Sequence, residues 1–165
     1  MGDMIIYIIR HAWAEDRDQA AYPNDDLRPL TAKGKKRFRR VAKRLGKRGF
    51  DPLHIATSPL VRCRQTADII VEYAPQQPSL DELDDLKPGS QLAPLLGWTV
   101  EHSDGDAAWV GHAPDVEELT AGLIGAPEAG IHFDKGAVAA IEFIGKPAIG
   151  KGQLLWLATA ELLKA

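Results

Sequence analysis

A run of five apolar residues, Ile5 to Ile9, constrains the fold of this chain more than any other feature. Four of the five are β-branched isoleucines and no polar residue interrupts them, which is typical of a strand buried on both faces of a parallel sheet. Arg10 and His11 follow directly. Because open α/β sheets bind their ligands at the carboxyl ends of the strands, this pair is predicted to lie at a binding edge.

The rest of the chain alternates short apolar segments with amphipathic ones, which predicts a three-layer α/β/α fold with a mainly parallel central sheet. The segment from Gly145 to Gly152 is predicted to turn between the last two strands, which then pair as an antiparallel hairpin. Residues 12–30 are polar and are expected to form a loop over the strand ends. Strands are expected near residues 4–9, 53–57, 107–111, 137–144 and 153–158, and helices near 31–48, 59–74, 89–96, 114–124 and, as a short element, 160–164.

The length of 165 residues predicts one domain over residues 1–165, and a hydrophobic content of 45% can supply its core. The single cysteine, Cys63, excludes an internal disulfide framework and is expected to be a small buried residue rather than a nucleophile. No apolar stretch is long enough to span a bilayer, and the N-terminus lacks the apolar segment of a secretory signal. We therefore expect a cytoplasmic protein with no membrane partner.

Two further segments place polar residues where apolar runs end. The run from Ala107 to Val110 is followed by Gly111 and then His112, and the run before Ser58 leads into a helix that carries Arg62 in its first turn. Ser58 is predicted to be the N-cap of that helix, with a proline at its first position. Guanidinium groups, imidazoles and the free N–H groups of a helix N-terminus suit a bound phosphoryl group.

The order of these motifs resembles the histidine phosphatase superfamily, and most closely its small branch of SixA-type phosphohistidine phosphatases. The resemblance implies a phosphoglycerate mutase-like architecture and a phosphatase that works through a phosphohistidine enzyme intermediate. It further implies phosphohistidine of a protein as the substrate. A small-molecule phosphomonoesterase of the same superfamily and a non-catalytic phosphate-binding or docking module are the alternatives. The matching segments are Arg10-His11-Ala12, Leu27-Arg28-Pro29-Leu30-Thr31 followed by Gly34, Ser58-Pro59 with Arg62 and Gln65-Thr66, and Gly111-His112-Ala113-Pro114.

The chemistry of four residues defines the expected reaction. His11 would attack phosphorus through one ring nitrogen, while its other nitrogen donates to a fixed acceptor, expected to be a backbone carbonyl. Arg10, Arg62 and His112 would surround the phosphoryl oxygens, where charge must be held during in-line transfer. Beside an anionic phosphate, His112 is expected to be driven toward its protonated form. Ser58 is a further candidate for substrate binding.

Two other positions carry open alternatives. The segment Leu80-Asp81-Glu82-Leu83 resembles the element that holds the general acid in other branches of the superfamily, which nominates Glu82 as the proton donor; the alternative is a solvated acidic loop. Arg28 is expected either to contact the phosphate or to form a salt bridge where the next helix begins. Ala12 stands where the wider superfamily usually has glycine, and its methyl group is tolerable unless the backbone requires a positive φ.

No cluster of Asp and Glu has metal-ligand spacing, and a cationic pocket would repel a divalent ion. The sequence therefore predicts a metal-independent activity that needs no cofactor. The expected partner is a phosphorylated protein, through its phosphohistidine, or a small phosphate ester.

Residues 31–48 contain ten Lys and Arg and no acid, although the whole chain has a net charge of −3. The segment is predicted to be an amphipathic helix with Thr31 as N-cap and Gly49 at its end. Its apolar residues recur at helical spacing: Phe38, Val41, Ala42 and Leu45. The charged face is expected to be solvated, with a docking patch for an acidic protein or a nucleic acid as the alternative. No aromatic residues are interleaved to stack on bases, so no nucleic-acid partner is predicted.

Overall fold

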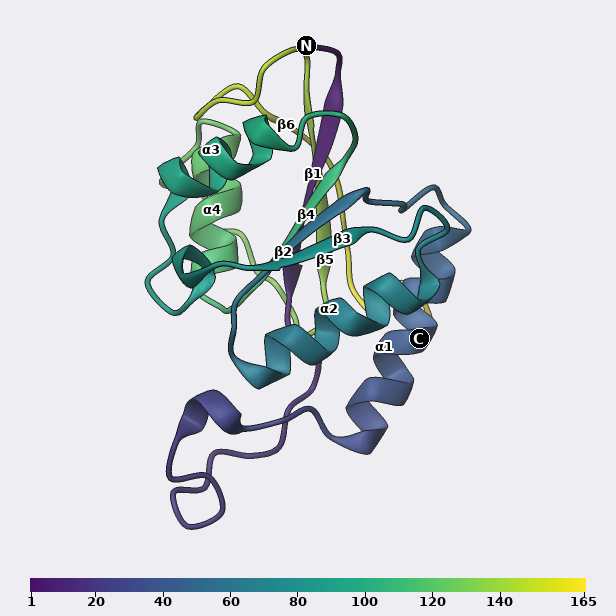
Figure 1. Ribbon diagram of the computed structural model, residues 1–165, viewed down its shortest axis with the longest axis vertical. Helices are drawn as coiled ribbons and strands as arrows, with labels where there is room; N and C mark the ends of the chain where they lie inside the picture. Colours follow the sequence, from purple (N-terminus) through teal and green to yellow (C-terminus); the bar gives the residue numbers. More distant parts are fainter.

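In the computed structural model, which describes residues 1–165, six strands form one sheet between two layers of helices (Figure 1). The strand order is β3-β2-β4-β1-β5-β6. The first four strands in sequence pair in parallel, and β5 and β6 add an antiparallel hairpin at one edge. The predicted three-layer, mainly parallel α/β fold and its terminal hairpin are confirmed. The strands are β1 (Met4–Arg10), β2 (His54–Thr57), β3 (Ser79–Glu82), β4 (Ala107–Gly111), β5 (Val138–Phe143) and β6 (Gln153–Ala158).

The apolar run that begins the chain forms β1, near the centre of the sheet. It pairs with β4 in parallel and with β5 in antiparallel orientation, so both of its edges are occupied. Tyr7 and Ile9 point into the core beneath α1 and α2, and Ile6 and Ile8 point into the core beneath α3 and α4. Burial on both faces explains why the alternation of a half-exposed strand is missing from this segment.

Two helices cover each face of the sheet (Figure 1). Helices α1 (Ala32–Gly46) and α2 (Val61–Tyr73) lie on one face, and α3 (Leu92–Glu101) and α4 (Asp115–Leu123) lie on the other. As predicted, Thr31 caps α1, because its hydroxyl accepts a hydrogen bond from the Gly34 N–H at 2.8 Å. No helix combines the length and the apolar composition that a bilayer crossing requires.

Three local expectations are wrong. The strand β3 was not predicted: its sequence, Ser-Leu-Asp-Glu, has little β propensity, and the strand forms because its backbone pairs with β2. Helix α3 begins and ends later than the expected range of 89–96. Residues 160–164 form turns rather than a short helix. Two short 3-10 helices, η1 (Asp25–Leu27) and η2 (Asp84–Leu86), lie in the loops.

The register of the sheet brings the predicted motifs to one edge. Arg10 pairs with Gly111 across β1 and β4, and Thr57 pairs with Val110 across β2 and β4. The next residues along the chain are His11, His112 and Ser58, so all three lie where parallel strands end. The loop of residues 12–30 extends below the same edge in Figure 1 and carries η1.

Candidate active site

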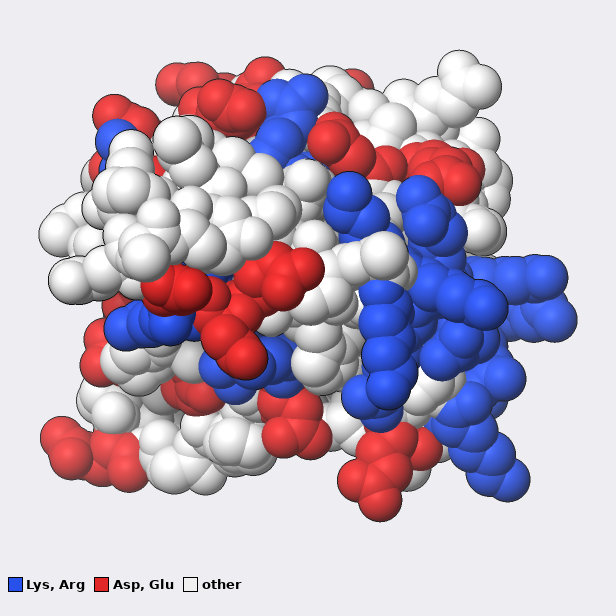
Figure 2. All heavy atoms as spheres, turned by 90° about the horizontal axis from the view of Figure 1, so that it is seen from below, with Lys and Arg blue, Asp and Glu red and all other residues white.

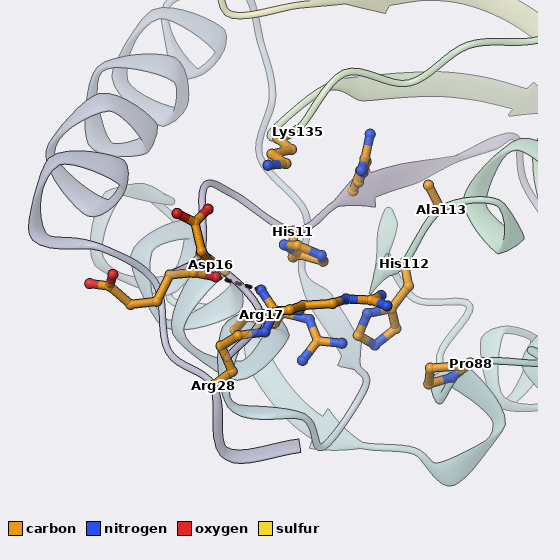
Figure 3. A pocket seen from close by; sticks show the side chains of 12 residues that line it. His11, Asp16, Arg17, Arg28, Pro88, His112, Ala113 and Lys135 are labelled. Carbon is orange, nitrogen blue, oxygen red and sulfur yellow. Dashed lines mark hydrogen bonds between the residues drawn. The ribbon is translucent and has the colours of Figure 1, made fainter. Parts of the chain in front are cut away.

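A pocket of about 340 Å³ lies at this edge of the sheet (Figure 3). It brings together five of the seven residues that the sequence nominates: Arg10, His11, Arg28, Arg62 and His112. These side chains come from the ends of β1 and β4, from the first turn of α2 and from the loop of residues 12–30. Figure 3 shows His11 at the centre of the pocket, with Lys135, Arg28 and His112 around it. Its many cations make the pocket suited to an anion.

His11 is held in one tautomer. Its Nδ1 lies 2.7 Å from the carbonyl oxygen of Ala12, and because a carbonyl can only accept, Nδ1 carries the proton. The lone pair of the ring is therefore on Nε2. This is the type of backbone acceptor expected from the sequence. Ala12 is fully buried and is not among the residues with positive φ, so its methyl group is accommodated.

Both pocket histidines are neutral at neutral pH. Burial lowers the pKa of His11 to about 4, and the charges of Arg62, Arg10 and Arg28 act in the same direction. Burial, with Arg62 and then His11, lowers the pKa of His112 to about 3. The two ring centroids are 5.4 Å apart. The pocket itself thus disfavours the protonated form expected for His112, and protonation requires the opposing charge of a bound phosphoryl group.

The low pKa of His11 makes a measurable prediction. Its ring protons should titrate in NMR spectra with a midpoint near pH 4, in contrast to the ordinary value of 6.5. Because the unfolded chain binds this proton more tightly than the folded protein, the associated stability is complete above about pH 6.5 and is lost as the pH falls toward 4. A His11 midpoint close to the ordinary value of 6.5 would contradict the prediction.

Ser58 positions His112 and does not line the pocket, which corrects its predicted role in substrate binding. The Ser58 hydroxyl is fully buried and lies 2.9 Å from Nε2 of His112. Its predicted role as N-cap is also wrong: α2 begins at Val61, after Leu60, and has no side-chain cap.

The Cys63 thiol, 3.4 Å from Nε2 of His112, is buried, and burial raises the pKa of the thiol to about 12. Cys63 is therefore a buried residue, as expected.

Asp25 joins two of the pocket arginines, and sequence reasoning missed it. One carboxylate oxygen is 2.8 Å from Nε of Arg28, and the other is 3.2 Å from Nη2 of Arg62. The hydrogen bond from Arg28 is the main cause that lowers the pKa of Asp25. Arg28 therefore forms a salt bridge and also lines the pocket, so its contact with a phosphate stays a prediction.

Two buried arginine nitrogens are left without a partner. Nε of Arg10 and Nε of Arg62 are inaccessible to solvent and bond to no protein atom. The remaining bonds hold each guanidinium in place: Arg10 donates to the carbonyl oxygen of Phe133 at 2.7 Å, and Arg62 donates to that of Asp25 at 2.9 Å. Buried donors without acceptors are uncommon in folded proteins.

The structure does not bring Glu82 into the pocket. Glu82 ends β3 at the edge of the sheet, where its carboxylate forms a 2.7 Å salt bridge with Arg64 on the outer side of α2. The carboxylates that line the pocket are those of Glu15 and Asp16, from the loop after β1. Sequence reasoning passed over them, together with Lys135, because polar residues in a loop give no periodic signal.

The position of Glu82 leads to a second prediction. Glu82→Gln is expected to change kcat/KM by less than about twofold, because a proton donor must come within hydrogen-bond distance of the leaving group. The measurement is steady-state turnover of a phosphohistidine peptide and of a phosphomonoester. A tenfold or greater loss specific to the phosphomonoester would instead place this carboxylate in the reaction.

Comparison with known proteins gives matches in sequence and in structure. Residues 6–90 match the profile of the histidine phosphatase superfamily (branch 1). An uncharacterized protein of Picosynechococcus sp. is 40% identical over 118 residues, which cover 70% of each chain. A probable phosphoglycerate mutase of Serratia proteamaculans is 39% identical over 67 residues, or 41% of this chain and 30% of that protein. The structure of the protein histidine phosphatase SixA complexed with tungstate shares the fold, with a TM-score of 0.84 and 23% identity over 97% of this chain and 99% of the other.

Proposed function

Because the chain belongs to the histidine phosphatase superfamily, we propose that it is a phosphatase that becomes phosphorylated on His11 and takes the phosphoryl group from phosphohistidine of a protein. One observation carries the proposal: His11, with its proton fixed on Nδ1 by Ala12, presents Nε2 in a pocket that four arginines line. Anion binding alone does not require a neutral imidazole with its tautomer fixed. The arrangement therefore favours an enzyme over a phosphate-binding module.

The proposed reaction has two in-line steps. In the first, Nε2 of His11 forms a bond to phosphorus while the bond from phosphorus to the substrate nitrogen breaks, and the leaving imidazole takes a proton from water. In the second, water attacks the phosphohistidine, the bond from phosphorus to Nε2 breaks, and phosphate is released. Arg10, Arg62 and His112 hold the charge on the phosphoryl oxygens in both steps.

The position of the acids favours an activated leaving group. Glu15 and Asp16 belong to the loop at the pocket mouth, and no carboxylate is among the buried residues that line the pocket. An alkoxide leaving group needs a well-placed proton donor, which contributes about 10²–10⁴-fold, whereas an imidazole leaves readily. We therefore expect kcat/KM to be higher for a phosphohistidine peptide than for a sugar phosphate. Equal values would favour the alternative, a small-molecule phosphomonoesterase.

The test is to trap the intermediate. The protein is incubated with a radiolabelled phosphohistidine peptide and, in parallel, with a labelled phosphomonoester, and is quenched in alkali. We expect acid-labile, alkali-stable label on the wild-type protein from the peptide and none on His11→Ala. Label from the phosphomonoester alone would identify a small ester as the substrate class. If no label is found and no phosphate is released from either, the chain is a binding module.

A third prediction concerns metal ions. Turnover is expected to change by less than about twofold on addition of a chelator, because the arginines and His112 supply the charge that a metal ion would otherwise provide. The measurement is phosphate release before and after treatment with EDTA. Loss of activity with EDTA and its recovery with Mg²⁺ would show that the prediction is wrong.

A further inference from the structure

The outer face of α1 carries a straight row of exposed cations, Lys33, Lys36, Arg40, Lys43 and Lys47. Their spacing alternates between three and four residues, which places all five along one side of a helix. At a rise of about 1.5 Å per residue, this cationic stripe is roughly 21 Å long. Figure 2 shows the corresponding concentration of Lys and Arg on one side of the molecule, while acidic residues are scattered over the rest of that face.

Folding gives no reason for the cationic stripe. Of the ten Lys and Arg in residues 31–48, Arg39 alone pairs with a carboxylate, that of Glu72 at 3.4 Å. Arg37 and Arg44 donate to backbone oxygens near the C-terminus, and no stripe residue has an acidic partner. Neighbouring like charges on a helix are destabilising, as are cations in its first turn. A feature that weakens the helix in isolation is consistent with selection for binding.

The cationic stripe is connected to the active site. A second cavity, of about 390 Å³, shares Arg10 and Lys135 with the active-site pocket and is also lined by Trp13 and by Arg37 of α1. The Arg37 guanidinium lies 4.3 Å from the Trp13 ring centroid. The start of α1 is tied to the same loop, because the N–H of Thr31 donates to the carbonyl oxygen of Trp13. Cations thus lie along the path from His11 to α1, although the carboxylates of Asp134 and Glu161 also line the second cavity.

We propose that the cationic stripe on α1 is the docking surface for an acidic segment of the protein that carries the phosphohistidine. This proposal rests on the function proposed above. Charge complementarity identifies the partner: a run of carboxylates about 20 Å long, extended or helical, matches five cations in one row. A protein segment is favoured over other polyanions for two reasons. The large apolar and aromatic side chains of α1 itself, Phe38, Val41 and Leu45, are buried, so the helix offers no ring to stack on bases and no large apolar side chain to enter a membrane.

The test compares four peptides at low and high salt. All four carry phosphohistidine. Two have a run of about six glutamates, roughly 20 Å long when extended, on the N-terminal or the C-terminal side of the phosphohistidine. The other two have glutamines in place of these glutamates. The variant Lys36→Glu/Lys43→Glu reverses two charges of the cationic stripe. The control, Lys146→Glu/Lys151→Glu, makes the same change in net charge in the exposed hairpin loop between β5 and β6. This loop lies at the end of the strands that is opposite the active-site pocket. Peptide binding is followed by fluorescence anisotropy, and turnover by release of phosphate.

We expect one of the glutamate peptides to have a kcat/KM about tenfold or more above that of its glutamine counterpart at low salt. The preference should disappear in Lys36→Glu/Lys43→Glu, persist in the control and weaken as salt shortens the Debye length to about 8 Å. Equal turnover of glutamate and glutamine peptides would overturn the docking proposal and leave the proposed function intact. If no peptide is dephosphorylated but a glutamate peptide still binds through the stripe, the docking surface stands and the proposed function falls. Tighter binding of duplex DNA or of vesicles containing phosphatidylserine than of either glutamate peptide would overturn the choice of a protein partner.

Discussion

Replacement of His11 by asparagine is expected to lower kcat by about 10⁴-fold or more, the largest effect of any single substitution in this chain. The nucleophilic Nε2 is lost, and no neighbouring group can replace it: His112 is held by Ser58 through Nε2, and the Cys63 thiol is buried and protonated. The asparagine amide can still donate to the Ala12 carbonyl oxygen, so the local backbone should keep its conformation. Release of phosphate from a phosphohistidine peptide measures the effect.

The same experiment separates catalysis from binding. Arg10, Arg28 and Arg62 remain in His11→Asn, so inorganic phosphate should bind within about threefold of the wild-type Kd, as the charges that attract it are unchanged. His54→Asn is the matched control, because His54 begins β2 at the edge of the sheet opposite the pocket and should leave kcat unaltered. Turnover by His11→Asn at more than about one hundredth of the wild-type rate would exclude the proposed nucleophile.

The sequence was sufficient to predict the fold class and the place of the pocket because both depend on local patterns. An uninterrupted apolar run of this length is typical of a buried strand, and the residues directly after such a strand lie at the ligand-binding edge of a parallel sheet. Arg10, His11 and His112 could therefore be located without knowledge of the strand order. Arg62 could be located from its place one turn into a helix that begins at the same edge.

Contacts between distant segments could not be predicted in this way. Asp25 reaches Arg62 across 37 positions of the chain, and only the folded loop brings them together. Ser58 has the residue type and position of a helix cap, but the helix begins later and its hydroxyl bonds to His112 instead. Glu82 matched a family motif, yet the sheet places it at an edge, where Arg64 binds it. In each case a tertiary contact overrode a correct local rule.

Arg62→Ala is expected to lower kcat/KM by about 10²–10³-fold, the usual result of removing one preorganised donor to a developing charge. Arg62 is suited to this role because its side chain lines the pocket and is almost completely buried, and its Nη atoms are fixed by Asp25. Loss of a donor with this degree of preorganisation should raise the barrier to phosphoryl transfer, so kcat should fall together with kcat/KM.

Arg62→Lys distinguishes the geometry of the side chain from its charge. A lysine retains the positive charge but not the planar fork, so it cannot both bind the Asp25 carboxylate and donate sideways to a phosphoryl oxygen. We expect it to recover less than about a tenth of the lost activity. Arg64→Ala is the matched control. Arg64 lies two positions further along α2, but it points away from the pocket and pairs with Asp68 and Glu82. Its removal should change kcat/KM by less than about twofold. Full activity in Arg62→Lys would mean that charge alone is sufficient. Equal losses of activity in Arg62→Ala and Arg64→Ala would mean that the effect arises from destabilisation of α2 rather than from the phosphate site.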